Sequence, residues 1–164
     1  MSLKTAYLAG GCFWGLEELF RAEPGVVDTE VGYAGGENVD PTYEYHPGHA
    51  ETLKITYDDT KTDYKKLLDF FFRIHDPTTK NRQGNDVGTS YRSAIFYASE
   101  LEKQIAEEVI RLTNESKLYA GKVVTTLEPF RGFYTAEDYY QDYLRKNPGG
   151  YSCHYVRSEK SLTE

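Results

Sequence analysis

The stretch from Lys4 to Phe20, KTAYLAGGCFWGLEELF, joins a strand pattern to a helix pattern through a glycine pair. The residues before Gly10-Gly11 are mostly apolar and β-prone, which is typical of a short strand. Pro24-Gly25 ends the helix that follows. Within that helix, four apolar residues recur at helical spacing: Phe13, Leu16, Leu19 and Phe20. This start predicts a fold in which helices pack on a β-sheet.

Beyond this start, strand-like and helix-like segments follow one another along the chain. Ser99 and Glu102 form the capping box of a helix that we expect to end just before Gly121. The predicted strands are residues 4–10, 26–33, 53–57, 93–98 and 123–127, and the predicted helices are 13–20, 63–74, a segment that begins at Ser99, and 136–145.

The predicted order of elements is β-α-β-β-α-β-α-β-α. Its first six elements match the split β-α-β arrangement, so we expect an α+β two-layer sandwich with a ferredoxin-like βαββαβ core. Residues 37–50 and 77–92 form long polar loops, which makes them candidates for functional loops. We expect these loops and an irregular C-terminal tail from Asn147 to gather over one edge of the sheet.

The composition fits one domain of ordinary size. The chain has 164 residues and a formal net charge of −7, and we expect a single domain over 1–164 with the tail at 147–164. An acidic chain is a poor match for nucleic acid, and no apolar run is long enough to cross a membrane. The first residues lack the pattern of a secretory signal peptide, so we expect a cytoplasmic protein. We also expect a monomer.

Cys12 is the residue that this arrangement leaves to be explained. It follows the glycine pair and directly precedes the first helix, where unpaired backbone N–H groups and the helix dipole favour a thiolate. The sequence holds one other cysteine, Cys153, and two cysteines do not make a disulfide framework. Position alone fits either a reactive cysteine or a small buried residue that starts a helix.

Five groups of motifs occur in order along nearly the whole chain. They are Gly10-Gly11-Cys12-Phe13-Trp14-Gly15; Gly32-Tyr33-Ala34-Gly35-Gly36; Pro41-Thr42-Tyr43 with Gly48-His49-Ala50-Glu51; residues 75–79 with 82–93; and residues 148–154. Together they resemble the peptide-methionine sulfoxide reductase A family. In this chain the loop between Tyr43 and Glu51 is shorter than the common family form, and Ser90 stands where glutamine is common.

The resemblance implies reduction of the S epimer of methionine sulfoxide, free or in proteins, with no cofactor and no metal. A sulfoxide oxygen leaves only if it is protonated while the sulfur is attacked, so the site needs a soft nucleophile, an acid and an apolar pocket. The resemblance assigns attack to Cys12 and proton donation to Glu51. It further implies oxygen contacts from Tyr43 and Tyr91, a methyl pocket walled by Phe13 and Trp14, and Asp86 near the site.

Recycling follows from the same resemblance. Attack leaves Cys12 as a sulfenic acid, which condenses with a nearby thiol to a disulfide. The matching tail implies Cys153 as that thiol, and Pro148-Gly149-Gly150 would let the tail reach the site. The disulfide then needs an external dithiol, for which we expect a thioredoxin.

Two other classes of protein remain open from the residues alone. A cysteine hydrolase would use Cys12, His49 and Asp86, because acyl transfer needs a cysteine, a histidine and a carboxylate. A metal-binding or interaction module would use Cys12, Cys153, His49 and His154. The second is disfavoured because zinc sites usually contain closely spaced ligand pairs such as Cys-x-x-Cys.

Overall fold

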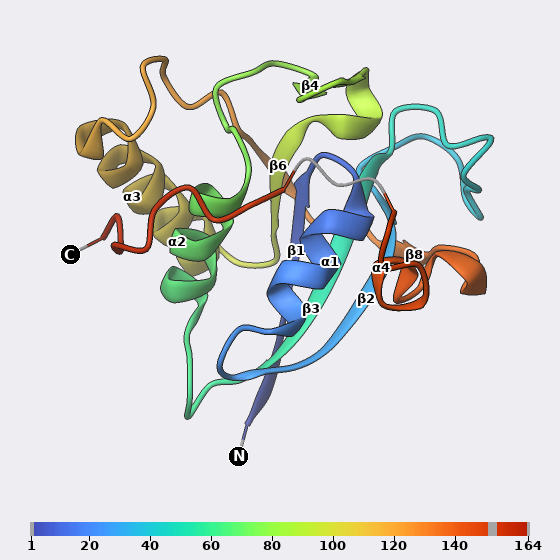
Figure 1. Ribbon diagram of the computed structural model, residues 1–164, viewed down its shortest axis with the longest axis horizontal. Coiled ribbons are helices and arrows are strands. Elements are labelled where there is room, and N and C mark those ends of the chain that lie inside the picture. The colour runs from blue at the N-terminus through green and yellow to red at the C-terminus, as the bar shows by residue number, and fades with distance from the viewer. Residues whose placement is uncertain (1, 151–153, 164) are drawn as a thin grey trace.

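The computed structural model describes residues 2–150 and 154–163 (Figure 1). This part of the chain is a mixed α/β structure with a six-stranded sheet, a two-stranded ribbon and four α-helices. The helices are α1 (Phe13–Arg21), α2 (Tyr64–Ile74), α3 (Glu100–Ser116) and α4 (Tyr143–Lys146). The strands are β1 (Leu3–Gly10), β2 (Val26–Ala34), β3 (Ala50–Asp58), β4 (Arg82–Gln83), β5 (Asp86–Val87), β6 (Ser93–Tyr97), β7 (Thr126–Pro129) and β8 (Phe133–Thr135).

The large sheet has the strand order β7-β6-β1-β3-β2-β8. The four central strands are antiparallel to one another, and β7 joins β6 in parallel after the α3 crossover. The register pairs Leu8 of β1 with Leu53 of β3, and Leu53 with Val31 of β2. Since side chains in one such row point to the same face, this row supplies apolar residues to a single core.

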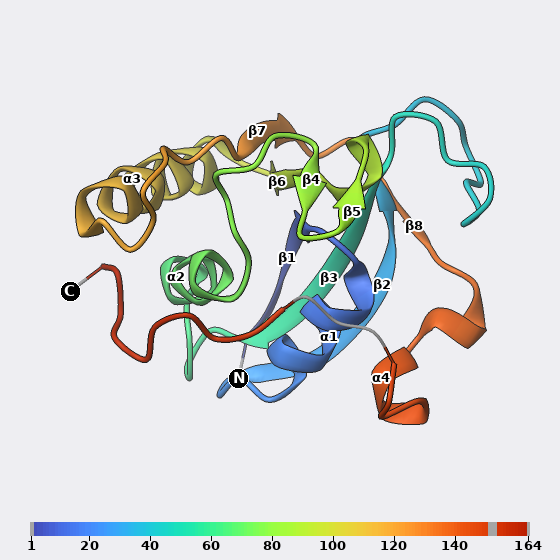
Figure 2. The ribbon, with the colours of Figure 1, turned by 45° about the horizontal axis from the view of Figure 1, so that its top comes forward.

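The main core lies between the sheet and the helices. Figures 1 and 2 show α1 and α2 over the same face of the sheet, with α3 beside α2. Their apolar stripes pack against the row described above in one continuous cluster, to which α1 contributes Phe13, Leu16 and Phe20 and α2 contributes Leu67, Leu68, Phe71 and Phe72. The helical spacing read from the sequence therefore marks the buried faces.

A second, smaller core cluster lies on the opposite face of the sheet, where Tyr7 and Phe130 pack against several alanines. Ala9, Ala34, Ala50 and Ala94 cluster there with Phe96. Three residues link β7 to β8, although these strands form opposite edges of the sheet. Such a link spans at most about 14 Å, whereas a flat six-stranded sheet is about 24 Å wide. The sheet must therefore curl toward this face, and the small alanine side chains leave room for it.

The strand β8 and the segment after it differ from the prediction. Residues 136–145 do not form one helix: a 3₁₀ turn at Asp138–Tyr140 precedes α4, and Asp142 between them has a φ of 54°. The reason is tertiary, because the side chain of Gln141 bonds both backbone groups of Val31 at 2.9 and 2.8 Å. This segment therefore continues the pairing of the sheet edge that β8 begins.

The end of α3 also differs from the prediction. Ser99 caps its start as predicted, since it accepts the Glu102 N–H at 3.2 Å, but the Glu102 carboxylate accepts the N–H of Ala98 rather than that of Ser99. The helix ends at Ser116, however, and Lys117 takes the left-handed conformation expected of a glycine there. Gly121 lies further along, and the following strand begins at Thr126 rather than at 123.

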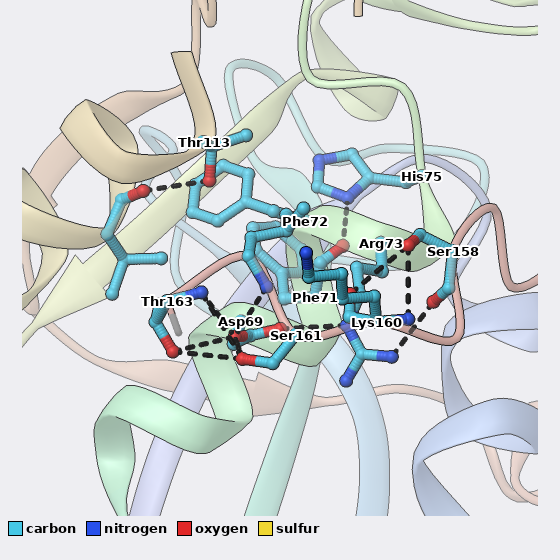
Figure 3. Close-up of polar contacts among 12 residues, drawn as sticks. Asp69, Phe71, Phe72, Arg73, His75, Thr113, Ser158, Lys160, Ser161 and Thr163 are labelled. Atoms are coloured by element: carbon cyan, nitrogen blue, oxygen red, sulfur yellow. Dashed lines mark hydrogen bonds and ion pairs between the residues drawn. The ribbon is translucent and has the colours of Figure 1, made fainter. Parts of the chain in front are cut away.

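The end of the chain lies along α2 (Figure 3). The buried carboxylate of Asp69 accepts the backbone N–H groups of Leu162 and Thr163 at 3.0 and 3.1 Å, and the hydroxyl of Ser161. Arg73 bonds Asp69 at 2.7 Å and the Ser158 carbonyl at 3.0 Å. The predicted irregular tail is thus held by specific polar contacts. Across the described residues, no helix has the length and apolar character needed to cross a membrane.

Candidate active site

Cys12 lies where β1 turns into α1. Gly11 has a φ of +94°, and a Cβ at this position would lie 2.6 Å from the Gln83 side chain, so both backbone and space require glycine. Cys12 is the N-cap residue of α1 and is 7% exposed. The next residue, Phe13, has a backbone N–H that the helix itself cannot satisfy.

That N–H group donates to Oε1 of Glu51 at 3.2 Å. Glu51 is the second residue of β3, which begins at Ala50 and so earlier than the strand predicted from residue 53, and it is 1% exposed. Burial raises its pKa to about 8, the bond from Phe13 lowers it less, and nearby Asp86 raises it. The structure therefore keeps a protonated carboxyl group beside the helix N-terminus at neutral pH.

Two tyrosine hydroxyls lie close to this carboxyl group. Tyr43 lies in the loop before β3, and Tyr91 ends the 3₁₀ turn Thr89–Tyr91. The two hydroxyls are paired with each other, and burial followed by the charge of Glu51 raises the pKa of both phenols. Both therefore stay protonated, and one proton of the pair remains available for another acceptor. The shorter loop still brings Tyr43 to the site.

Asp86 completes the polar side of the site. It lies in β5, and its charge raises the pKa of Glu51, Tyr43 and Tyr91, which places it among them. Burial raises the pKa of Asp86 itself. Its buried Oδ2 has no hydrogen-bond partner among the described residues, so this oxygen can receive a donor.

Aromatic rings form the other side of the site. Phe13 is fully buried and lies 5.8 Å from the Tyr33 ring and 6.1 Å from the Tyr140 ring. Trp14 is half-buried and stacks on Tyr143 at 3.8 Å. Tyr140 also lies 4.7 Å from Tyr43.

Sequence reasoning missed Tyr140 and Tyr143 as members of this aromatic wall. The three-residue spacing of these tyrosines was the available signal, but it indicated a helix face and not what that face touches. Glu17 in α1 accepts the Asp142 N–H at 2.7 Å, which holds the two tyrosines against α1. The wall thus joins residues from opposite ends of the chain.

His49 serves the loop that leads to β3. Its Nδ1 accepts the Gly36 N–H at 3.1 Å, and its Nε2 donates to the Asn38 carbonyl at 2.8 Å. Burial lowers its pKa, which favours this neutral form. Both ring nitrogens are occupied, so the structure argues against His49 as the base of a cysteine hydrolase. Among residues 2–150 and 154–163, no group of three His, Cys, Asp or Glu side chains is placed to hold a metal ion.

The tail returns to the start of α1 at His154. Its Nε2 donates to the carbonyl of Gly10 at 2.6 Å, and burial lowers its pKa to about 4, so the ring is neutral. This bond holds His154 against Gly10, which precedes Cys12 by two residues in the sequence. The predicted recycling residue, Cys153, lies outside the described residues.

A buried cysteine at a helix N-terminus, with a protonated carboxyl group and two phenols beside it, is typical of cysteine-dependent enzymes that carry their own proton donor. Comparison with known proteins narrows this class. The model of the family "Peptide methionine sulfoxide reductase" matches residues 4–163. The chain belongs to this family and is an oxidoreductase.

Individual relatives and solved structures are also similar to this chain. A peptide methionine sulfoxide reductase MsrA of Mycobacterium sp. (strain MCS) is 58% identical over 159 residues, 97% of this chain and 93% of that protein. The reduced form of Mxr1 from Saccharomyces cerevisiae is similar in structure, with a TM-score of 0.84, 40% identity, and 95% and 93% of the two chains covered. A structure of Mxr1 in complex with Trx2 has a TM-score of 0.61, 31% identity, and 95% and 91% coverage.

Proposed function

We propose that this protein reduces the S epimer of methionine sulfoxide, free or in proteins, to methionine, with Cys12 as the nucleophile. The observation that carries the proposal is the buried Glu51 carboxyl group, bonded to the Phe13 N–H at 3.2 Å and with its pKa raised to about 8. A sulfoxide needs such a proton on its oxygen while a thiol attacks its sulfur. Family membership supports the same reaction.

In the first step, the Cys12 sulfur attacks the sulfoxide sulfur and Glu51 gives its proton to the oxygen. The paired hydroxyls of Tyr43 and Tyr91 stabilise that oxygen as its charge develops, one by donating to it and the other through the pair, and Asp86 orients the donors around it. The S–O bond and the transient bond between the two sulfur atoms both break as the oxygen moves to the Cys12 sulfur, and the thiol proton of Cys12 restores the Glu51 carboxyl group. The products are methionine and a Cys12 sulfenic acid, so the sulfur of Cys12 is oxidised as that of the substrate is reduced.

In the second step, the Cys153 thiol attacks the sulfenic sulfur, which releases water and forms a Cys12–Cys153 disulfide. The His154–Gly10 hydrogen bond supports this pairing, because it fixes the residue that follows Cys153 close to Cys12 along the chain. A thioredoxin then reduces the disulfide by thiol exchange. The similar Mxr1 structure in complex with Trx2 supports this partner.

Replacing Cys153 with serine should separate reduction from recycling. The variant should reduce about one equivalent of substrate, because Cys12 and its proton donor remain, and then stall with thioredoxin while a sulfenic acid accumulates. Quenched-flow product counting and trapping with dimedone measure these two quantities. Ser152→Ala, a neighbouring change, is the matched control and should turn over normally. Normal cycling of Cys153→Ser with thioredoxin would exclude Cys153 as the resolving residue.

The geometry also supports selectivity between sulfoxide epimers. The methyl group fits against Phe13 and Trp14, the oxygen faces Glu51 and the tyrosines, and Cys12 takes the line of attack. The methyl group, the oxygen and the line of attack then each have a fixed direction at the sulfoxide sulfur. Only one epimer can satisfy all three and still point the rest of the methionine toward solvent. With racemic methionine sulfoxide and dithiothreitol, we expect consumption of the S epimer and recovery of the R epimer by chiral chromatography. Equal loss of both epimers would contradict the proposed site.

The proposal also covers the topology of the core, the extent of the domain, the oligomeric state and the location of the protein. We infer a ferredoxin-like core from the central strand order β6-β1-β3-β2 with α1 and α2 on one face. We also infer one domain over residues 1–164, because the main core draws on both the first strand and Leu162 near the end. A monomer in the cytoplasm is the corresponding expectation for the assembly and location.

A further inference from the structure

The two loops that carry Tyr43 and Tyr91 are joined by a histidine that the mechanism does not use. The Nε2 of His46 lies 2.8 Å from the Ser90 hydroxyl, and its Nδ1 lies 2.7 Å from the carbonyl of Thr42. Thr42 and Ser90 directly precede the two tyrosines in sequence. One imidazole ring therefore spans the residues next to both phenols.

The ring is held on both sides of this span. Backbone hydrogen bonds between Thr42 and Tyr45 in both directions close residues 42–45 into a tight turn, at 2.9 and 3.2 Å. His46 stacks on Tyr33 of β2, with ring centroids 5.0 Å apart. The Tyr33 hydroxyl and the Tyr43 backbone N–H donate to the same Glu137 carboxylate, at 3.1 and 3.2 Å. The sheet thus fixes the imidazole ring, and the ring links the two loops.

We propose that His46 is a positioning residue for the proposed reduction: by bridging Thr42 and Ser90, it sets the Tyr43 and Tyr91 hydroxyls at hydrogen-bonding separation. One hydroxyl of the pair then donates to the other, which leaves one phenol proton directed to the sulfoxide oxygen. The inference rests on the function proposed above.

The hydrogen-bond partners of His46 determine the tautomer of its ring. A carbonyl oxygen can only accept, so Nδ1 carries a proton and donates to Thr42. In the neutral ring Nε2 then accepts from the Ser90 hydroxyl. When the ring gains a second proton, Nε2 donates to the same hydroxyl oxygen, because serine can both donate and accept. The bridge is therefore kept in both protonation states.

Conservative variants of His46 separate the two contacts. Glutamine reaches as far as Nε2 and can keep the bond to Ser90, whereas asparagine reaches as far as Nδ1 and can keep the bond to Thr42. The rate of sulfenic acid formation at saturating methionine sulfoxide should fall about tenfold in His46→Ala and His46→Asn, since small misplacement of catalytic groups is costly. His46→Gln should restore most of the rate. Glu44→Gln, an exposed change in the same turn, is the control.

A mutant cycle tests whether His46 acts through the tyrosine pair. Ser90→Ala should resemble His46→Ala, and the double variant should be no slower than either single variant. In a Tyr91→Phe background, His46→Ala should cost less than about twofold, because the pair is already broken. Equal rescue by glutamine and asparagine, or full additivity with Tyr91→Phe, would overturn the proposal.

Unfolding measurements separate this inference from the proposed function. Denaturation midpoints of the His46→Ala, Ser90→Ala and double variants should be non-additive if the side chains are bonded in solution. If the wild-type protein failed to reduce methionine sulfoxide while this coupling was present, the proposed function would be wrong and the bridge correct. If the midpoints were additive while the wild-type protein was active, the bridge would be wrong and the proposed function correct.

Discussion

Replacing Cys12 with serine is expected to abolish methionine sulfoxide reduction, even in a single turnover with enzyme in excess. A hydroxyl group at this position is far less nucleophilic than a thiol and cannot form a sulfenic acid. Removal of the nucleophile in covalent enzymes costs on the order of a million-fold, which is below detection here. Product is measured by rapid quench after one equivalent of substrate.

The serine variant should fold normally, because Cys12 is the N-cap of α1 and serine is a favoured residue at that position. Its thermal unfolding midpoint is therefore the control for loss of activity. Retention of one equivalent of reduction by Cys12→Ser would remove Cys12 from the proposed role. The remaining cysteine, Cys153, would then have to be tested as the nucleophile.

Glu51→Gln is expected to slow the first chemical step by about 100- to 10,000-fold, the usual contribution of general acid catalysis. Glutamine preserves the shape of the side chain and an oxygen that can accept the Phe13 N–H, but it has no proton to transfer. The later step, disulfide formation from a sulfenic acid made beforehand, should change much less. Stopped-flow fluorescence of Trp14 follows the first step, because Trp14 is the only tryptophan.

The raised pKa of Glu51 predicts how the rate of the first step depends on pH. Its pKa is raised to about 8, mainly by burial, so the acid form is complete below that pH and is lost above it. The first-step rate should therefore fall above pH 8, by about tenfold per pH unit. Glu51→Gln should be slow at every pH and should lack this alkaline decrease.

Asp86→Asn is the matched control for Glu51, since it changes a second, half-buried carboxyl group of the site without removing the assigned acid. It should lower the rate less than Glu51→Gln and should keep the alkaline decrease, shifted to lower pH because one raising charge is gone. A Glu51→Gln rate within about threefold of wild type, well below the range for an acid catalyst, would transfer the acid role to Tyr43 or Tyr91.

Much of the local structure could be predicted from the sequence. The glycine pair before Cys12, the apolar stripe after it and the capping box at Ser99 are local signals, and the strand, turn and helices form where these signals lie. Motif order along the chain was sufficient to recognise the family, which the comparisons confirmed. These features depend on neighbouring residues, or on residue identity alone.

The predictions that failed depended on distant partners. Residues 136–145 have helical spacing, but Gln141 bonds Val31 of β2, more than a hundred residues away, and the helix is interrupted. The strand β8 has three residues and exists because β2 offers it a free edge. Neither contact leaves a pattern within its own segment of the sequence.

Residue identity and local pattern were enough to name the groups assigned to the reaction: a cysteine at a helix start, a glutamate, two tyrosines and an aromatic pair. The protonation and pairing of these groups depend on the folded chain. The raised pKa of Glu51 comes mainly from its burial within the folded domain, and the Tyr43–Tyr91 bond from the approach of two loops. Desolvation and hydrogen-bond geometry are properties of surroundings assembled from the whole chain, so no local segment encodes them.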